Sequence, residues 1–109
     1  MTSRHGIPEH AWAQIIAVLA RFPALESAVL FGSRAKGTYK PGSDIDLALS
    51  GPALDWRVIG RIYDALDDLL LPYSFSLIQH DAATDPDVAA HIARVGIPIY
   101  RLETAASAK

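Results

Sequence analysis

The chain has 109 residues, half of them apolar, which is enough for one hydrophobic core and too few for two ordinary domains. Its formal charge of −2 gives no general attraction to polyanions, so the charge does not indicate nucleic acid as a partner. The absence of cysteine excludes disulfides and thiolate metal sites, and no apolar run approaches the length of a membrane span.

The N-terminal region is predicted to begin with a mobile segment, residues 1–6, followed by an amphipathic helix. Pro8 suits a first helical turn, and apolar residues recur at helical spacing up to Phe22, where Pro23 ends the pattern. Polar residues interrupt this region, so it does not resemble a signal peptide, and we expect a cytoplasmic protein without a membrane partner. Residues 27–31 are nearly all apolar, which predicts a strand covered on both faces.

The next segment, residues 32–43, is a loop rich in Gly, Lys and Ser, and it leads into a strand with two aspartates. Side chains alternate along a strand, so Asp44 and Asp46 project from one side, with their backbone positions roughly 7 Å apart. Such carboxylates repel unless a cation lies between them, and Mg²⁺ accepts one or two carboxylates together with phosphates and water. Gly32 and Ser33 can offer N–H groups and a hydroxyl to those phosphates. The segment therefore predicts a phosphate site beside a magnesium site.

A second helix is predicted from an N-cap at Asp55 to about Leu71. Its buried side is predicted to consist of Val58, Ile59, Ile62, Leu66, Leu69 and Leu70. Asp67 and Asp68 are interpreted as a solvated face, because adjacent helix positions point about 100° apart and do not converge on a metal.

The last third of the chain predicts a strand, a helix and a short strand. Residues 73–78 alternate between apolar and polar side chains, which indicates a strand. Asp85 opens a third helix, with Pro at the first turn, and Gly96 ends it. Residues 97–100 form a final strand at a sheet edge, because Pro98 cannot donate to a ladder.

This order of elements predicts an α/β fold, a two-layer sandwich in which a mixed sheet of about four strands packs against three main helices. Residues 1–109 form a single domain, with residues 104–109 as a second mobile segment. The site of Asp44 and Asp46 is expected at an exposed edge or mouth.

Two simpler interpretations of the Gly-Ser and Asp-x-Asp segment are weaker. Gly32 and Gly37 have the spacing of a Walker A loop, but Thr38-Tyr39 replaces the required Lys-Ser/Thr. An ordinary hairpin with solvated acids does not explain why the Gly-Ser pair and both aspartates occur together at this spacing. The segment resembles the signature of the nucleotidyltransferase superfamily that includes DNA polymerase β and kanamycin nucleotidyltransferase: an apolar strand, Gly-Ser, a spacer and Asp-x-Asp.

A closer resemblance extends over nearly the whole chain. Residues 69–75 and 85–100 look like the C-terminal half of the minimal nucleotidyltransferases (MNT), short prokaryotic proteins often encoded beside a helical HEPN ribonuclease. The two form a toxin–antitoxin pair. The resemblance implies that this chain is the antitoxin, which transfers AMP from ATP to a tyrosine hydroxyl of the HEPN toxin with Mg²⁺ as cofactor. No direct nucleic-acid partner is expected.

The resemblance also implies roles for individual residues. Asp44 and Asp46 would be the catalytic residues and metal ligands. The nucleotide-binding set comprises Gly32, Ser33, Arg34 and Ser43. Arg34 and Lys36 either neutralise phosphate charge or are solvated loop cations. The simplest role for Ser43 is to order the turn before Asp44.

One position departs from the family. A third carboxylate is expected on the strand after the second helix, where this chain has Ser76. A hydroxyl supplies neither negative charge nor a base near pH 7, and losing a general base lowers a rate by about 10²–10⁴. His80 and Asp81 are candidate replacements. Asp81 falls past the expected end of the strand, whereas His80 shares the face of Ser76 if the strand runs that far, although a lone His of this kind is more often a surface or packing residue.

Three functional hypotheses remain. The first is an active protein adenylyltransferase, which the intact signature favours. The second is a catalytically impaired antitoxin that neutralises its toxin by binding alone, which Ser76 favours. The third, a transferase that modifies small molecules, is weakened because a single short domain leaves no second domain to hold the acceptor.

Overall fold

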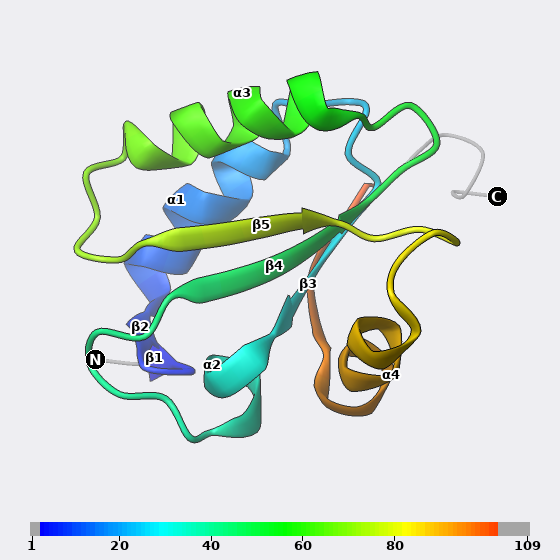
Figure 1. Cartoon of the computed structure of the whole chain (residues 1–109). Coiled ribbons are helices and arrows are strands. Elements are labelled where there is room, and N and C mark those ends of the chain that lie inside the picture. Colours follow the sequence, from blue (N-terminus) through cyan, green and yellow to red (C-terminus); the bar gives the residue numbers. More distant parts are fainter. Residues whose placement is uncertain (1–2, 103–109) are drawn as a thin grey trace, which may run out of the picture.

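The computed structural model describes residues 3–102, and Figure 1 shows their helices arranged around a central sheet. In chain order the elements are β1 (Ser3–Arg4), β2 (Ile7–Pro8), α1 (Glu9–Leu19), β3 (Ser27–Phe31), α2 (Gly32–Lys36), β4 (Ile45–Ser50), α3 (Trp56–Asp67), β5 (Phe75–Gln79), α4 (Pro86–Val95) and β6 (Ile97–Arg101). Within the described range, no helix is both long enough and apolar enough to cross a membrane.

The main sheet has four strands in the order β5-β4-β3-β6. β3 pairs antiparallel with both β4 and β6, whereas β4 and β5 are parallel, because α3 carries the chain from one to the other. The predicted mixed sheet of about four strands is therefore confirmed, and β6 with Pro98 lies at an edge as predicted. β4, which carries Asp46, is instead an inner strand, so this aspartate lies on a sheet face.

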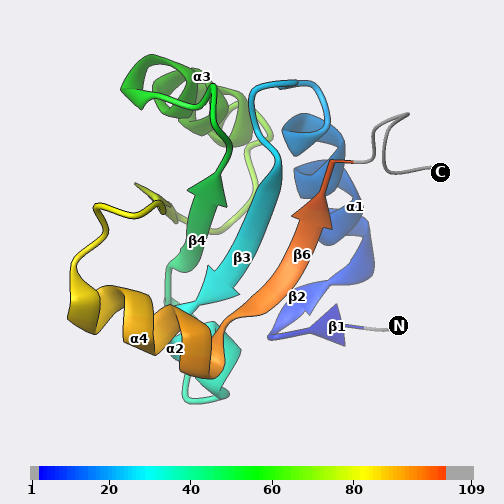
Figure 2. The same ribbon diagram turned by 90° about the vertical axis from the view of Figure 1, so that its right-hand side faces the viewer.

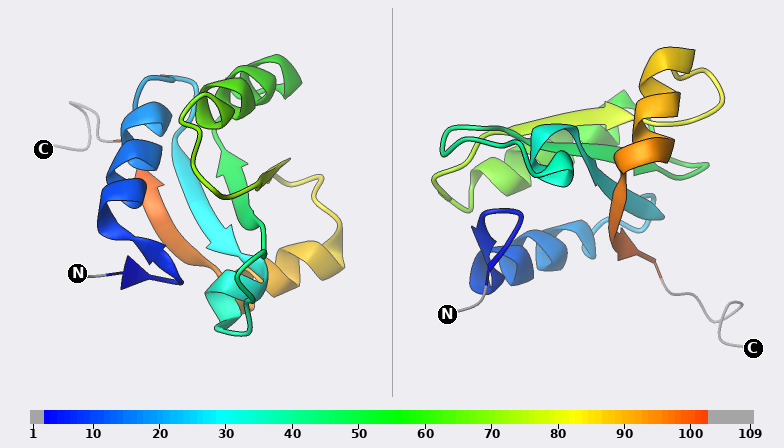
Figure 3. Two further views of the ribbon diagram at one scale, coloured as in Figure 1. Left: turned by 90° about the vertical axis from the view of Figure 1, so that its left-hand side faces the viewer. Right: turned by 90° about the horizontal axis from the view of Figure 1, so that it is seen from below.

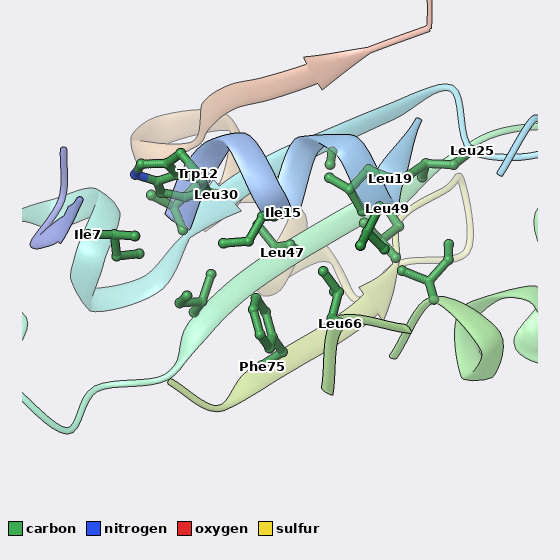
Figure 4. Close-up of a cluster of buried hydrophobic side chains, with 14 of the residues drawn as sticks. Ile7, Trp12, Ile15, Leu19, Leu25, Leu30, Leu47, Leu49, Leu66 and Phe75 are labelled. Atoms are coloured by element: carbon green, nitrogen blue, oxygen red, sulfur yellow. The ribbon is translucent and has the colours of Figure 1, made fainter. Parts of the chain in front are cut away.

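The two faces of the sheet have different coverings. α1 and α3 pack on one face, where Leu30 and Leu47 meet Ile15 and Leu66 in the core of Figure 4. In the right panel of Figure 3, α4 lies on the side of the sheet opposite α1. Figure 2 shows α4 beside α2 at the end of β3. The second face is covered only in part, and the residues of the aspartate motif lie there.

The N-terminal hairpin β1–β2 occupies part of the segment predicted to be mobile, residues 1–6. Trp12 donates its indole N–H to the carbonyl of Arg4 over 3.0 Å, and Arg34 donates to the carbonyl of His5 over 2.9 Å. Local composition did not indicate the hairpin, because its partners lie on α1 and α2. The remainder of that segment and the predicted C-terminal tail lie outside the described residues.

The end of α3 corrects one prediction. The last turns tighten, because Leu69 N–H donates to the carbonyl of Leu66 and Leu70 N–H to that of Asp67, each over 3.1 Å. Leu70 then adopts a left-handed backbone with φ 56°, which ends the helical path. Its side chain is 88% exposed, whereas the sequence predicted it on the buried side of the helix.

Candidate active site

Asp46 is the second residue of β4 and lies on the sheet face opposite the core. Its register partners are Phe31 on β3 and Ser76 on β5, and its side chain is half-buried. Asp44 comes just before β4 and is exposed, yet it is near enough for its charge to act on Asp46. The two predicted metal ligands therefore lie together at the start of β4.

The electrostatics of the pair favour a bound cation. Burial raises the pKa of Asp46 above 3.8, repulsion from Asp44 raises it further, and His91 and Arg34 oppose this rise. The one ion pair within residues 3–102 lies elsewhere, so neither aspartate is neutralised in that way. Two oxygen-bearing carboxylates that repel each other suit Mg²⁺, which fills its remaining positions with phosphate and water. The same range contains no group of three or more His, Cys, Asp or Glu that could hold a metal.

Gly32 brings the Gly-Ser turn directly against Asp46. Its φ is 75°, and a Cβ added there would collide with the Asp46 carboxylate, so only glycine permits this approach. Ser33 follows, half-buried, in the short helix α2, which Gly37 ends with φ 84°. The sequence predicted a loop here, although a glycine just after the last helical residue is a recognisable helix end. The predicted proximity of Gly-Ser and Asp-x-Asp is present in the structure.

Arg34 is a buried structural cation, with 2% of its surface exposed. Its Nη2 and Nε donate to the carbonyl of Ser43 over 2.9 and 3.2 Å, and Nη1 reaches the N-terminal hairpin. The guanidinium also lies 5.2 and 5.3 Å from the rings of Tyr39 and Tyr73. The solvated-cation interpretation of Arg34 is therefore wrong, whereas Lys36 is exposed.

Ser43 connects this buried cation to the aspartates. Its hydroxyl accepts the backbone N–H of Lys40 over 2.8 Å, while its carbonyl receives Arg34. These bonds order the turn before Asp44, which agrees with the simplest role predicted for Ser43. Its further assignment to nucleotide binding stays a prediction.

Ser76 lies beside Asp46, at the position where the resemblance implies a third carboxylate. Parallel register partners point to the same face, so the two side chains are neighbours. β5 ends at Gln79, and His80 follows about 13 Å along the chain from Ser76 at the opposite end of the sheet. His80 contacts Thr84 there over 3.1 Å.

Asp81 lies beyond β5 as well and has a local role. Its carboxylate accepts the backbone N–H of Ala83 over 2.8 Å, which orders the turn before α4. Distance along the strand thus removes both His80 and Asp81 as replacements for a carboxylate at Ser76.

His91 is a residue near the site that the sequence analysis did not single out. Its ring meets that of Phe31 edge-to-face, with centroids 6.2 Å apart, and Phe31 is the register partner of Asp46. The charge of His91 lowers the pKa of Asp46. No local pattern marks this residue, because α4 reaches the site only through the tertiary fold.

The comparison with protein families settles the class. Residues 13–104 match the family described as Polymerase beta, Nucleotidyltransferase. The chain belongs to this nucleotidyltransferase family. No curated protein matches the chain.

Solved structures share the nucleotidyltransferase fold at low sequence identity. A chain of a toxin–antitoxin complex with AMP-PNP has TM-score 0.68 and 23% identity, over 84% of this chain and 74% of that one. A tri-AMPylated Shewanella oneidensis HEPN toxin in complex with MNT antitoxin gives TM-score 0.64 and 20% identity, over 86% and 72%. The MntA-HepT toxin-antitoxin gives 0.63 and 20%, over 87% and 74%. These structures confirm the predicted fold, and the family match confirms the predicted nucleotidyltransferase superfamily.

Proposed function

We propose that this nucleotidyltransferase is an antitoxin that transfers AMP from ATP to a tyrosine hydroxyl of a partner HEPN ribonuclease toxin, with Mg²⁺ as cofactor. The observation that carries the proposal is the meeting of Asp44, Asp46 and the Gly32-Ser33 turn on one partly open sheet face. Support comes from the structural neighbours, one of which contains AMP-PNP and another an AMPylated HEPN toxin with its MNT antitoxin. The proposal includes a cytoplasmic location, where the chain would meet ATP.

The residues of the chain act mainly by position and charge. Asp44 and Asp46 would hold Mg²⁺, which neutralises phosphate charge when bound. Gly32 leaves room beside the Asp46 carboxylate, and the Ser33 hydroxyl would donate to a phosphate oxygen. The acceptor oxygen would form a bond to the α-phosphorus while the bond to pyrophosphate breaks, and the phenolic proton would leave to solvent.

Ser76 favours a second candidate, an antitoxin that neutralises the toxin by binding alone. Its hydroxyl lies next to Asp46 at the start of β5, and it cannot take the acceptor proton as a carboxylate would. The site would then bind nucleotide weakly or without transfer, and the surface of the folded domain would cover the toxin.

One assay separates these candidates. The chain is incubated with ATP, Mg²⁺ and the HEPN protein encoded beside it, and the intact toxin is then weighed by mass spectrometry. We expect a mass increase of one or more AMP groups that Asp46→Ala abolishes and that Asp87→Ala, at an exposed acid on α4, preserves. No increase with a stable complex would support binding alone. No increase and no complex would contradict both candidates.

A further inference from the structure

α3 carries an exposed apolar stripe on its outer side, which we define as Trp56, Tyr63 and Leu70. Their side chains are 74%, 44% and 88% exposed. Trp56 and Tyr63 are seven apart on α3 and therefore lie on one face of the helix. Leu70 is exposed just past the end of α3, where the backbone leaves the helical path. Gly60 lies between the first two and has open space around it, which leaves a flat gap. Within residues 3–102 the only other exposed large apolar side chain is Tyr39, which lies over Arg34.

A charged flank runs beside this stripe. It consists of Arg57, Arg61, Asp64 and Asp68, so its first half is basic and its second half acidic. Residues four apart in a helix are neighbours, so each half places like charges side by side, which is unfavourable. Arg61 and Asp64, three apart, are neighbours of opposite charge, and Arg57 lies 5.1 Å from the centre of the Trp56 ring. The one ion pair in the described part of the chain joins other residues. Within the described residues a single copy thus forms no ion pair along this flank.

A two-fold axis near positions 62–63 supplies a complement for each of these residues. Two antiparallel α3 helices related by this axis bring Arg57 beside Asp68 of the second copy, and Arg61 beside its Asp64. The same axis brings the two Tyr63 rings together and places Trp56 of each copy towards the C-terminal end of α3 of the other. In an antiparallel pair related by a two-fold axis, the charged flank of one copy lies beside the same flank of the other copy. Such an interface is self-complementary. Gly60 allows the two backbones to approach closely near the crossing.

We propose that two copies of this chain associate through an antiparallel contact between their α3 helices. The occupant is a second copy because the apolar and the charged residues are complemented by one and the same axis. Figure 1 shows α3 remote from α2 and α4, on the far side of the sheet from the face of Asp46. Association through α3 leaves both candidate active sites open, so this inference does not depend on the proposed function.

Sedimentation equilibrium of the full chain tests the contact. We expect the apparent mass to rise from 11.8 kDa towards twice that value between micromolar and millimolar concentration. Arg61→Asp and Asp64→Arg should each weaken association at least about tenfold, because each puts like charges across the axis twice. The double variant R61D/D64R should restore association, since the swap recreates the pairing. Arg101→Asp, an exposed charge at the end of β6, is the matched control.

Crosslinking tests the position of the axis. The chain has no cysteine, so Tyr63→Cys introduces a single thiol beside the proposed axis, and Ala90→Cys places one on the exposed side of α4. With diamide as oxidant, we expect Tyr63→Cys to form disulfide-linked dimers at least about tenfold faster than Ala90→Cys. Equal rates, a mass that stays at one chain at all concentrations, or a double variant that fails to restore association would each overturn the proposal. The proposal would also be overturned if the chain stayed monomeric and substitutions in α3 abolished its binding to the HEPN toxin.

Discussion

Strand β4 presents two contrasting surfaces that are one residue apart. Leu47 faces α1 and α3 and is completely buried in the core, where burial stabilises by about 25 cal/mol per Å² of apolar surface. Asp46 faces the other side, with a pKa raised by burial and by repulsion from Asp44. The alternation of a strand therefore separates the side chains that hold the fold from those of the candidate active site. We therefore expect that each set can be changed with little effect on the other.

The largest expected effect comes from a substitution on the sheet face of Asp46. Ser76→Asp places a carboxylate beside Asp46 and should raise the rate of AMP transfer by about 10²–10⁴, measured as AMP incorporated into the toxin. Ser27→Asp, which adds the same charge to the same face at the opposite end of the sheet, should not change the rate. An unchanged rate in Ser76→Asp would place the third carboxylate elsewhere.

A substitution on the core face of β4 should lower the stability of the protein. Leu47→Ala leaves a cavity between the sheet and its helices and should lower the free energy of unfolding by about 3 kcal/mol, measured by urea denaturation. Asp46→Ala, one residue away, should change it by less than about 1 kcal/mol while abolishing transfer. Equal losses of stability in the two variants would contradict the separation of the faces.

Substitutions of Gly32, Gly37 and Gly42 should lower the free energy of unfolding by different amounts. Gly32→Ala combines a left-handed φ with a collision against Asp46, and should cost about 2 kcal/mol or more and weaken Mg²⁺–ATP binding. Gly37→Ala has only the positive φ and should cost about 1 kcal/mol. Gly42→Ala has neither and serves as the control. Urea denaturation and isothermal titration calorimetry give the two readouts, and equal costs at Gly32 and Gly37 would rule out the collision.

The smallest expected effect concerns the charge of Asp46. Because folding raises its pKa, the ionised carboxyl lowers the stability of the metal-free protein at neutral pH. This cost is absent below the ordinary pKa of 3.8 and grows as pH rises through the raised pKa. Asp46→Asn should therefore stabilise the protein at pH 7 by less than about 1 kcal/mol, since water screens the site, and the gain should vanish in acid.

Bound Mg²⁺–ATP should make the wild-type chain more stable than Asp46→Asn. With Mg²⁺ and ATP present, the wild-type chain gains binding free energy that Asp46→Asn lacks, so it should have the higher melting temperature at neutral pH. Thermal unfolding with and without Mg²⁺–ATP provides the measurement. A variant that keeps its advantage in saturating ligand would argue against Asp46 as a metal ligand.

Much of the fold was predictable because its signals are local. Asp55 accepts the N–H groups of Arg57 and Val58 as an N-cap, and Asp85 caps α4 in the same way. The strand Ser27–Phe31 follows from its apolar run, and Pro98 marks an edge. The sequence did not predict the N-terminal hairpin, whose partners Trp12 and Arg34 lie on α1 and α2. It was wrong at Leu70, where the last turn of α3 tightens and the backbone leaves the helix.

For this protein, the sequence alone determined the family motif, the order of the main helices and strands apart from the N-terminal hairpin and α2, and the placement of Asp44 and Asp46 together, since alternation and capping act over a few residues. The tertiary structure alone decided that Ser76 is the neighbour of Asp46, and that Arg34 is buried under two tyrosines. These outcomes depend on which strands pair and which helices cover them. Such contacts join residues far apart in the chain, and no short pattern records them.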